Sequence, residues 1–172
     1  MKIVVKILIL IFLIFLFTIC TKPKKYPETP KIEFTSFIVK DTIDNPELQN
    51  HVKMGILKFS FVDGNGDIGL TQGDTLPPFD TSSVYYYNLY INMFEMKGGE
   101  FEHVNLSIPL NFRTPLVVPH GQNKTLKGWV LTELTYNFPL QYDTIMYTFH
   151  IYDRAHNQSN IASTDTIILS QE

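Results

Sequence analysis

The stretch that decides the fold runs Phe59-Ser60-Phe61-Val62-Asp63-Gly64-Asn65-Gly66-Asp67-Ile68-Gly69-Leu70. Its first half predicts a β-strand, because two aromatic residues alternate with smaller ones and therefore fall on one face. Its second half predicts a tight loop, because three glycines let the backbone turn where a Cβ atom would clash. The rest of the chain is interpreted outward from this strand and loop.

Three oxygen-bearing side chains occupy alternate positions of the loop, which is typical of calcium-binding loops. The order of such loops adds two more candidates, so the predicted Ca²⁺ ligands are Asp63, Asn65, Asp67, Gly69 and Asp74. The match is partial, because isoleucine follows Asp67 where such loops have glycine and an aspartate replaces their final glutamate. The alternative is an Asx-turn loop whose side chains accept hydrogen bonds from backbone N–H groups.

Short apolar segments divided by turn residues continue in both directions from this loop. Outside the N-terminus, no segment has the i, i+3, i+4, i+7 spacing of an amphipathic helix. The predicted strands are 32–39, 54–62, 84–96, 100–106, 126–136, 144–152 and 161–169. Together with the turns between them, they predict an all-β fold built as an antiparallel sandwich or a barrel. Segment 40–52 is expected to be a loop or a short helical turn, and segment 108–119 is expected to be an irregular loop.

The N-terminus is typical of an exported lipoprotein. Two lysines precede an apolar run that ends at Ile19, which is the pattern of a signal peptide over residues 1–19. Cys20 follows as the single cysteine, so it cannot form an internal disulfide, and we expect it to carry a lipid. An uncleaved anchor and an ordinary signal peptide are the alternatives. Residues 20–31 are rich in proline and lysine and predict a tether, which leaves one domain over residues 32–172.

Catalytic patterns are absent from the sequence. There is no G-x-S-x-G, P-loop or G-x-G-x-x-G motif, and the histidines lack metal-binding spacing. We therefore expect a protein that is not an enzyme, with a hydrolase as the weakest of the functions considered. The net charge is −3, and no basic run is interleaved with aromatic residues, which argues against a nucleic-acid partner.

Several segments together resemble secreted lipoproteins of Bacteroidota. The segments are 61–70, 87–95, 113–115 and 121–128, followed by Ile151-Tyr152-Asp153-Arg154-Ala155-His156-Asn157-Gln158-Ser159-Asn160. The last is similar to the final hairpin of bacterial immunoglobulin-like domains, where glycine usually stands at position 156. The resemblance implies an exported immunoglobulin-like β-sandwich without a known activity. Surface lipoproteins of that phylum often have acidic residues after the cysteine, so the lysines after Cys20 favour the periplasmic face of the outer membrane.

Asp-Thr followed by an aliphatic residue occurs four times and is similar to the O-glycosylation acceptor motif of exported Bacteroidota proteins. The acceptors would be Thr42, Thr75, Thr144 and Thr166. The alternative is structural: the aspartate ends a turn and the threonine begins a strand.

Exposed aromatic residues suggest what the domain could bind. Tyr86, Tyr90 and Trp129 are candidates for a partner or glycan surface, since aromatic rings anchor protein interfaces and stack on sugars. Ordinary cross-strand packing of these rings is the alternative. We expect an interaction module, a subunit of an envelope protein complex, with a glycan-binding module as the second hypothesis.

Overall fold

The computed structural model describes residues 24–169, and these form a β-sandwich without helices. One layer is a three-stranded sheet in the order β1 (Lys31–Asn45), β2 (Asn50–Asp63) and β6 (Leu126–Asn137). The other layer is a six-stranded sheet in the order β4 (Glu100–His103), β3 (Leu89–Lys97), β7 (Thr144–Ile151) and β8 (Ala162–Ser163). In that sheet, β5 (Leu110–Phe112) also pairs with β3, and β9 (Ile167–Ile168) pairs with β7.

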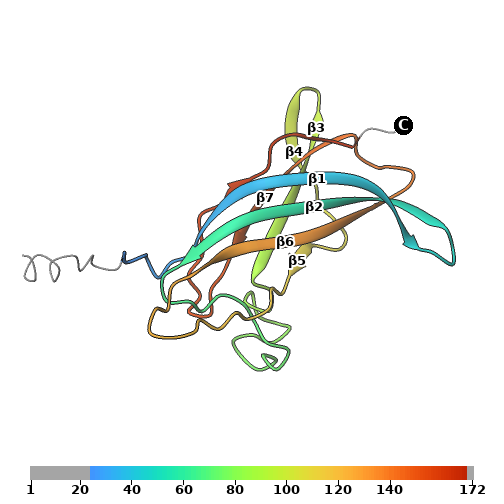
Figure 1. Cartoon of the computed structure of the whole chain (residues 1–172). Helices are drawn as coiled ribbons and strands as arrows, with labels where there is room; N and C mark the ends of the chain where they lie inside the picture. Colours follow the sequence, from blue (N-terminus) through green and yellow to red (C-terminus); the bar gives the residue numbers. More distant parts are fainter. Residues whose placement is uncertain (1–23, 170–172) are drawn as a thin grey trace, which may run out of the picture.

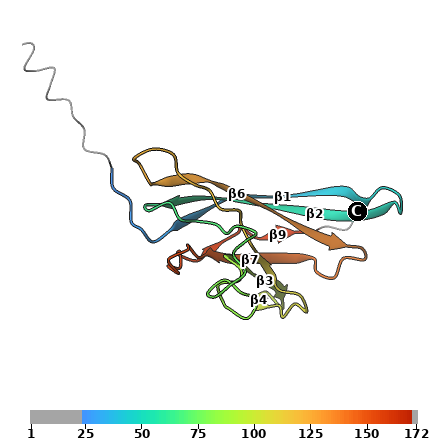
Figure 2. The ribbon, with the colours of Figure 1, turned by 90° about the horizontal axis from the view of Figure 1, so that it is seen from below.

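All named strand pairs are antiparallel, and the two layers face each other in Figure 2. This architecture confirms the predicted all-β sandwich. The immunoglobulin-like assignment stays a prediction. Within residues 24–169 there is no helix long and apolar enough to cross a membrane.

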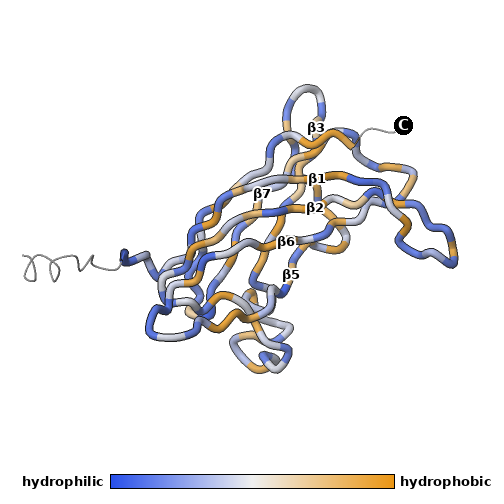
Figure 3. The backbone as a smooth tube through the Cα atoms, viewed as in Figure 1, coloured by the Kyte–Doolittle hydropathy of each residue, from blue (hydrophilic) through white to orange (hydrophobic). Residues whose placement is uncertain are grey.

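The core lies between the layers because each strand sends alternate side chains inward. Phe59 of β2 and Phe149 of β7 meet with ring centroids 4.9 Å apart, and both are fully buried. Burial of such a side chain stabilises the fold by about 1.5–3 kcal/mol. Figure 3 shows the apolar residues concentrated along the strands, whereas the turn between β1 and β2 is hydrophilic.

A buried polar pair also joins the two layers. The hydroxyls of Tyr136 on β6 and Tyr147 on β7 share a 2.7 Å hydrogen bond. Burial raises the pKa of Tyr147 to about 12 and that of Tyr136 further in the same direction. Both hydroxyls therefore stay protonated, and their hydrogen bond satisfies two polar groups that packing removes from water.

The predicted loop at 40–52 is wrong. The strands β1 and β2 continue as a long hairpin through most of it, and only Pro46 to Gln49 form the turn. The Asn45 side chain shapes that turn by accepting hydrogen bonds from the N–H groups of Glu47 and Leu48. The strand was not predicted because the residues of this segment are polar. An exposed hairpin does not need an apolar face along its whole length.

The strand predicted from residue 84 begins only at Leu89. Before it, Asn88 is 3% exposed, and its side chain both accepts a hydrogen bond from the N–H of Thr114 and donates one to its hydroxyl. This exchange holds residues 84–88 as turns instead of a strand. Two further predictions need correction: β5 lies within the expected loop 108–119, and the last strand is divided into β8 and β9.

Candidate metal centre

The loop after β2 carries one fully buried carboxylate. Asp63 is the last residue of β2 and is 0% exposed. One of its oxygens, Oδ2, accepts a 2.9 Å hydrogen bond from the N–H of Asp67, so the backbone folds back over the side chain. The left-handed backbone of Gly69 (φ 101°) then lets the chain pass Pro115 closely. The loop is therefore compact, and its side chains turn inward.

A third carboxylate reaches this loop from the other layer of the sandwich. Asp153 follows β7, is 3% exposed, and forms an antiparallel bridge with Ile68. The N–H of Arg154 donates to the carbonyl oxygen of Asp67 over 3.1 Å and fixes the two loops together. As a result, one carboxylate oxygen from each of Asp63, Asp67 and Asp153 lies within 4.8 Å of the other two.

Three buried oxygens in this loop have no hydrogen-bond partner. They are Oδ1 of Asp63, Oδ1 of Asn65 and Oδ1 of Asp67. A buried acceptor without a donor costs about 1–3 kcal/mol, and more when it carries charge. Together with Asp153 after β7, the loop therefore has the composition of a cation site: three carboxylates, one amide oxygen, and three acceptors that the described protein atoms do not satisfy.

The electrostatics of the cluster agree with this interpretation. Burial raises the pKa of Asp63 to about 6, and the neighbouring charges of Asp67 and Asp153 add to the rise. The pKa of Asp67 is also raised, first by burial and then by the charge of Asp153. A bound cation would reverse both effects, because it favours the ionised form of each carboxylate.

Two of the predicted calcium ligands, Asp74 and Gly69, have other roles in the structure. Asp74 is not a member of the cluster; its carboxylate is bound instead by Arg154 over 2.6 and 3.0 Å and by the N–H of Thr71 over 2.7 Å. These bonds hold the pKa of Asp74 well below its usual range. Gly69 shapes the backbone of the loop and is not in the cluster. The structure brings together Asp63 and Asp67, adds Asp153, and buries the Oδ1 atom of Asn65 in the same loop.

Asp153 was not among the predicted ligands, because residues 151–160 were noted only for their similarity to a final hairpin. A signal was available, since Asp153 ends a cleanly alternating strand in the same way that Asp63 does. The resemblance placed glycine at 156, and His156 indeed has a left-handed backbone (φ 68°). Its N–H donates to the carbonyl oxygen of Asp153 over 3.2 Å, so this turn holds the third carboxylate in place.

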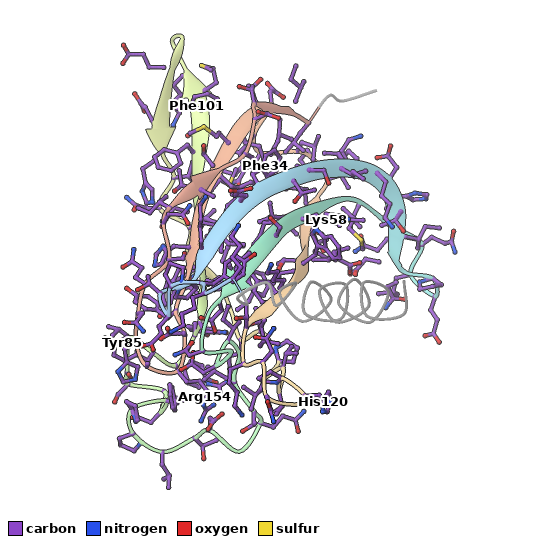
Figure 4. All side chains as sticks on the ribbon, turned by 60° about the vertical axis from the view of Figure 1, so that its left-hand side comes forward. Phe34, Lys58, Tyr85, Phe101, His120 and Arg154 are labelled. Carbon is purple, nitrogen blue, oxygen red and sulfur yellow. The ribbon has the colours of Figure 1, made fainter. Side chains whose placement is uncertain are left out.

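Two arginines hold in place the long connection between the Asp63 loop and β3. Arg154 binds Asp74, and Arg113 donates to the carbonyl oxygens of Tyr86, Thr71 and Asp74 over 2.6, 3.1 and 2.9 Å. Figure 4 shows Arg154 and Tyr85 at the end of the molecule where this connection lies. These hydrogen bonds fix the connection to Arg154, the residue that follows Asp153 of the cluster.

The predicted aromatic surface does not form one patch. Tyr90 lies on β3 of the six-stranded sheet, where it stacks on His150 with centroids 5.3 Å apart, and Tyr86 packs against Tyr87 and Arg113. Trp129 lies on β6 of the other sheet and is 65% exposed. The tyrosines are half-buried by their neighbours, so Trp129 is the one of the three that presents a large free ring.

The remaining predicted sites are placed as follows. Thr75 and Thr166 are exposed, whereas Thr42 and Thr144 are half-buried, so the first two are the more accessible for modification. Cys20 and the signal peptide lie outside the described residues. The described end of the tether is docked: the N–H of Gly64 donates to the carbonyl oxygen of Pro27 over 2.9 Å.

Comparison of the chain with protein-family models, with curated proteins and with solved structures gives no match.

Proposed function

We propose that the chain is a non-catalytic interaction module of the cell envelope whose sandwich is stabilised by one Ca²⁺ ion. The observation that carries the calcium part is the set of three buried, unpartnered oxygens on Asp63, Asn65 and Asp67 beside the carboxylate of Asp153. Ca²⁺ takes oxygen ligands at about 2.3–2.6 Å, so ligand oxygens around one ion lie up to about 5 Å apart. The carboxylate spacing within 4.8 Å agrees with that shell.

Calcium at this place would act as a link between the two sheets. Asp63 ends β2 of the three-stranded sheet and Asn65 and Asp67 follow it, whereas Asp153 follows β7 of the six-stranded sheet. One ion would offset most of the charge of three mutually repelling carboxylates and fix both loops. The remaining ligands would come from backbone carbonyls and water, as is usual for this ion.

Calorimetric titration of the full-length chain in detergent with CaCl₂ tests this part. We expect one site in the wild type and strongly reduced affinity in Asp153→Asn. Asp74→Asn is the matched control, since Asp74 is paired with Arg154 and should leave calcium affinity nearly unchanged. Equal binding by the wild type and Asp153→Asn would contradict the site, and loss of binding in Asp74→Asn alone would restore the linear loop order.

The envelope location is supported by the signal peptide pattern and Cys20. We propose a lipid anchor on Cys20 that holds the domain at the periplasmic face of the outer membrane. Cys20→Ala should release the protein from the membrane fraction. If the mature mutant fractionates with the membrane as the wild type does, Cys20 is not the anchor.

The interaction part is supported by exposed apolar side chains on the outer face of the three-stranded sheet. Ile38, Trp129 and Leu131 are 56%, 65% and 63% exposed. Affinity isolation from detergent-solubilised membranes should recover a stoichiometric protein partner, and co-expression of a second copy with a different tag detects pairing of the chain with itself.

Glycan binding is the second candidate function, and Trp129 is the observation that favours it. Its ring is exposed, with the Lys58 ammonium 5.4 Å from the ring centroid, and an exposed indole is suited to stacking on a sugar. Retention on a glycan array that is lost in Trp129→Ala, without a protein partner, would favour this function over the first.

A further inference from the structure

The two edges of the three-stranded sheet are built differently. The β1 edge is capped near its start by Asn160, whose side chain accepts from the N–H of Ile32 over 2.9 Å and donates to its carbonyl oxygen over 3.0 Å. The register of β1 on β2 also shifts between Phe34 and Ser36 and again between Ile43 and Asn45. A capped and irregular edge resists the addition of another strand.

The β6 edge has no such protection. Its register on β2 is unbroken from Leu126 to Asn137, and among residues 24–169 no strand pairs with its other side. The six-stranded sheet has short outer strands instead: β4 has 4 residues, and β8 and β9 have 2 each. Because β6 is long, regular and unpaired on its outer side, it is the edge of this sandwich best suited to strand addition.

The hydrogen bonds of Ile32 identify which backbone groups of β6 are free. Because Ile32 directs its N–H and C=O away from β2, its partner Phe61 directs its own toward β6, onto Gly128. Alternation along β6 then turns the backbone groups of Lys127, Trp129, Leu131 and Glu133 toward the open edge.

An apolar groove runs along the same edge. One part, of about 580 Å³, lies between β6 and the segment 112–117, and Phe61, Phe112, Val117 and Val130 line it. A second part, of about 290 Å³, lies beside Leu134 and is lined by Met93, Leu106 and Leu110. The sandwich is therefore open along β6, and a strand added there would cover apolar side chains as well as backbone groups.

We propose that β6 pairs with β6 of a second copy of this chain, antiparallel and about a two-fold axis at Val130. This places Lys127 opposite Glu133 of the partner subunit and Trp129 opposite the partner's Leu131. The edge is self-complementary because its basic and acidic residues lie at equal distances from Val130 in the sequence, as an isologous interface requires. The inference rests on the proposed interaction function and names its partner.

The side chains at this edge are available for that pairing. Trp129 and Leu131 are 65% and 63% exposed, and Lys127 and Glu133 are exposed as well. The Lys127 ammonium donates a hydrogen bond to the hydroxyl of Tyr26 and lies 3.9 Å from the centroid of its ring, and neither contact neutralises its charge. Cross-strand pairs of opposite charge and of apolar side chains both stabilise antiparallel strands.

Light scattering of the full-length chain in detergent, over a range of concentrations, tests the proposal. We expect a dimer for the wild type and a monomer for Leu131→Lys, which adds a charge to the pairing edge. Ile38→Lys is the matched control, because Ile38 has similar exposure on the same face but lies on the capped β1 edge. It should stay dimeric. A wild-type monomer at all concentrations, or equal dissociation of both variants, would overturn the proposal.

Charge reversal tests the register. Lys127→Glu and Glu133→Lys should each weaken the dimer several-fold, because each brings like charges together twice in the dimer, and the double variant should restore it. Failure of this rescue would overturn the register. If the wild type is monomeric and a different membrane protein is recovered and lost with Leu131→Lys, the occupant is that protein and not a second copy. Calcium titration of Leu131→Lys checks the fold separately from either outcome.

Discussion

Asp63 and Asp74 lie in the same stretch of chain and have opposite surroundings. Asp74 is bound by the guanidinium of Arg154 and by Thr71, and its pKa is lowered. Asp63 is buried with two other carboxylates nearby, one of its oxygens has no partner, and its pKa is raised to about 6. The protein itself supplies a cationic group to Asp74 but not to Asp63.

The difference indicates how the two sites contribute to stability. The Asp74 site is complete within the chain, so its contribution should not depend on added metal. The Asp63 cluster is incomplete without a cation, because burial and like charges oppose ionisation of its carboxylates. Calcium dependence should therefore be confined to the cluster.

The largest expected effect is that of Asp63→Asn on the unfolding free energy, which should change sign between chelator and calcium. In chelator this variant should be as stable as the wild type or more stable, because it removes one of three repelling charges. In excess calcium it should be less stable than the wild type by about 2–3 kcal/mol, the stabilisation expected at about 100 times the Kd. Denaturant unfolding under both conditions measures this. Destabilisation of the same size in both would contradict the account.

The next largest difference in stability is expected between alanine substitutions of the two neighbouring glycines, Gly64 beside Asp63 and Gly73 beside Asp74. A Cβ atom on Gly64 would lie 2.3 Å from the carbonyl oxygen of Tyr26 and 2.4 Å from that of Pro27. Gly64→Ala should therefore cost about 1–3 kcal/mol, as overpacking does. Gly73→Ala is the control, since its Cβ would meet only the Thr71 hydroxyl at 3.8 Å. We expect it to be neutral, and equal losses for both in thermal unfolding would show that the tether does not dock here.

Asp74→Asn should have a smaller effect that is independent of metal. It weakens a partly exposed ion pair with Arg154, which typically contributes about 1 kcal/mol or less. The loss in unfolding free energy should be the same in calcium and in chelator. A loss that appears only with calcium would mean that Asp74 belongs to the metal site after all.

The pH dependence in chelator should also distinguish the sites. Since the folded-state pKa of Asp63 is raised to about 6, the metal-free fold should gain stability as the pH falls from about 6 toward 4, by about 1–2 kcal/mol. Asp74, with its lowered pKa, should cost stability only below about pH 4.

Burial lowers the pKa of His150, which opposes the Asp63 effect near pH 6. The unfolding free energy of the wild type should therefore be compared with that of Asp63→Asn at each pH, so that the contribution of His150 cancels. A difference between the two proteins that is constant from pH 7 to about pH 4 would show that Asp63 is not perturbed.

Local patterns in the sequence were sufficient for part of this structure. The alternation of 144–152 predicted β7, and the spacing of Asp63 and Asp67 predicted two carboxylates that do converge. Both features depend on neighbours in the chain, where side-chain direction follows directly from backbone period. The number and shortness of such segments predicted the sandwich.

What the sequence could not give depends on distant partners. Asp153 joins the cluster only because β7 ends beside the loop after β2, and Asn88 ends a predicted strand only because Thr114 is there to exchange hydrogen bonds. The open edge of β6 is likewise a property of sheet order, which local spacing does not determine.

Thermal unfolding of the full-length chain in excess calcium and in excess chelator tests the central claim most directly. We expect the melting temperature to be several degrees higher with calcium, because about 2.7 kcal/mol at 100 times the Kd corresponds to such a shift in a domain of this size. Asp67→Ala should remove the difference. Identical melting temperatures of the wild type in calcium and chelator would contradict the metal centre and leave a hydrogen-bonded acidic turn.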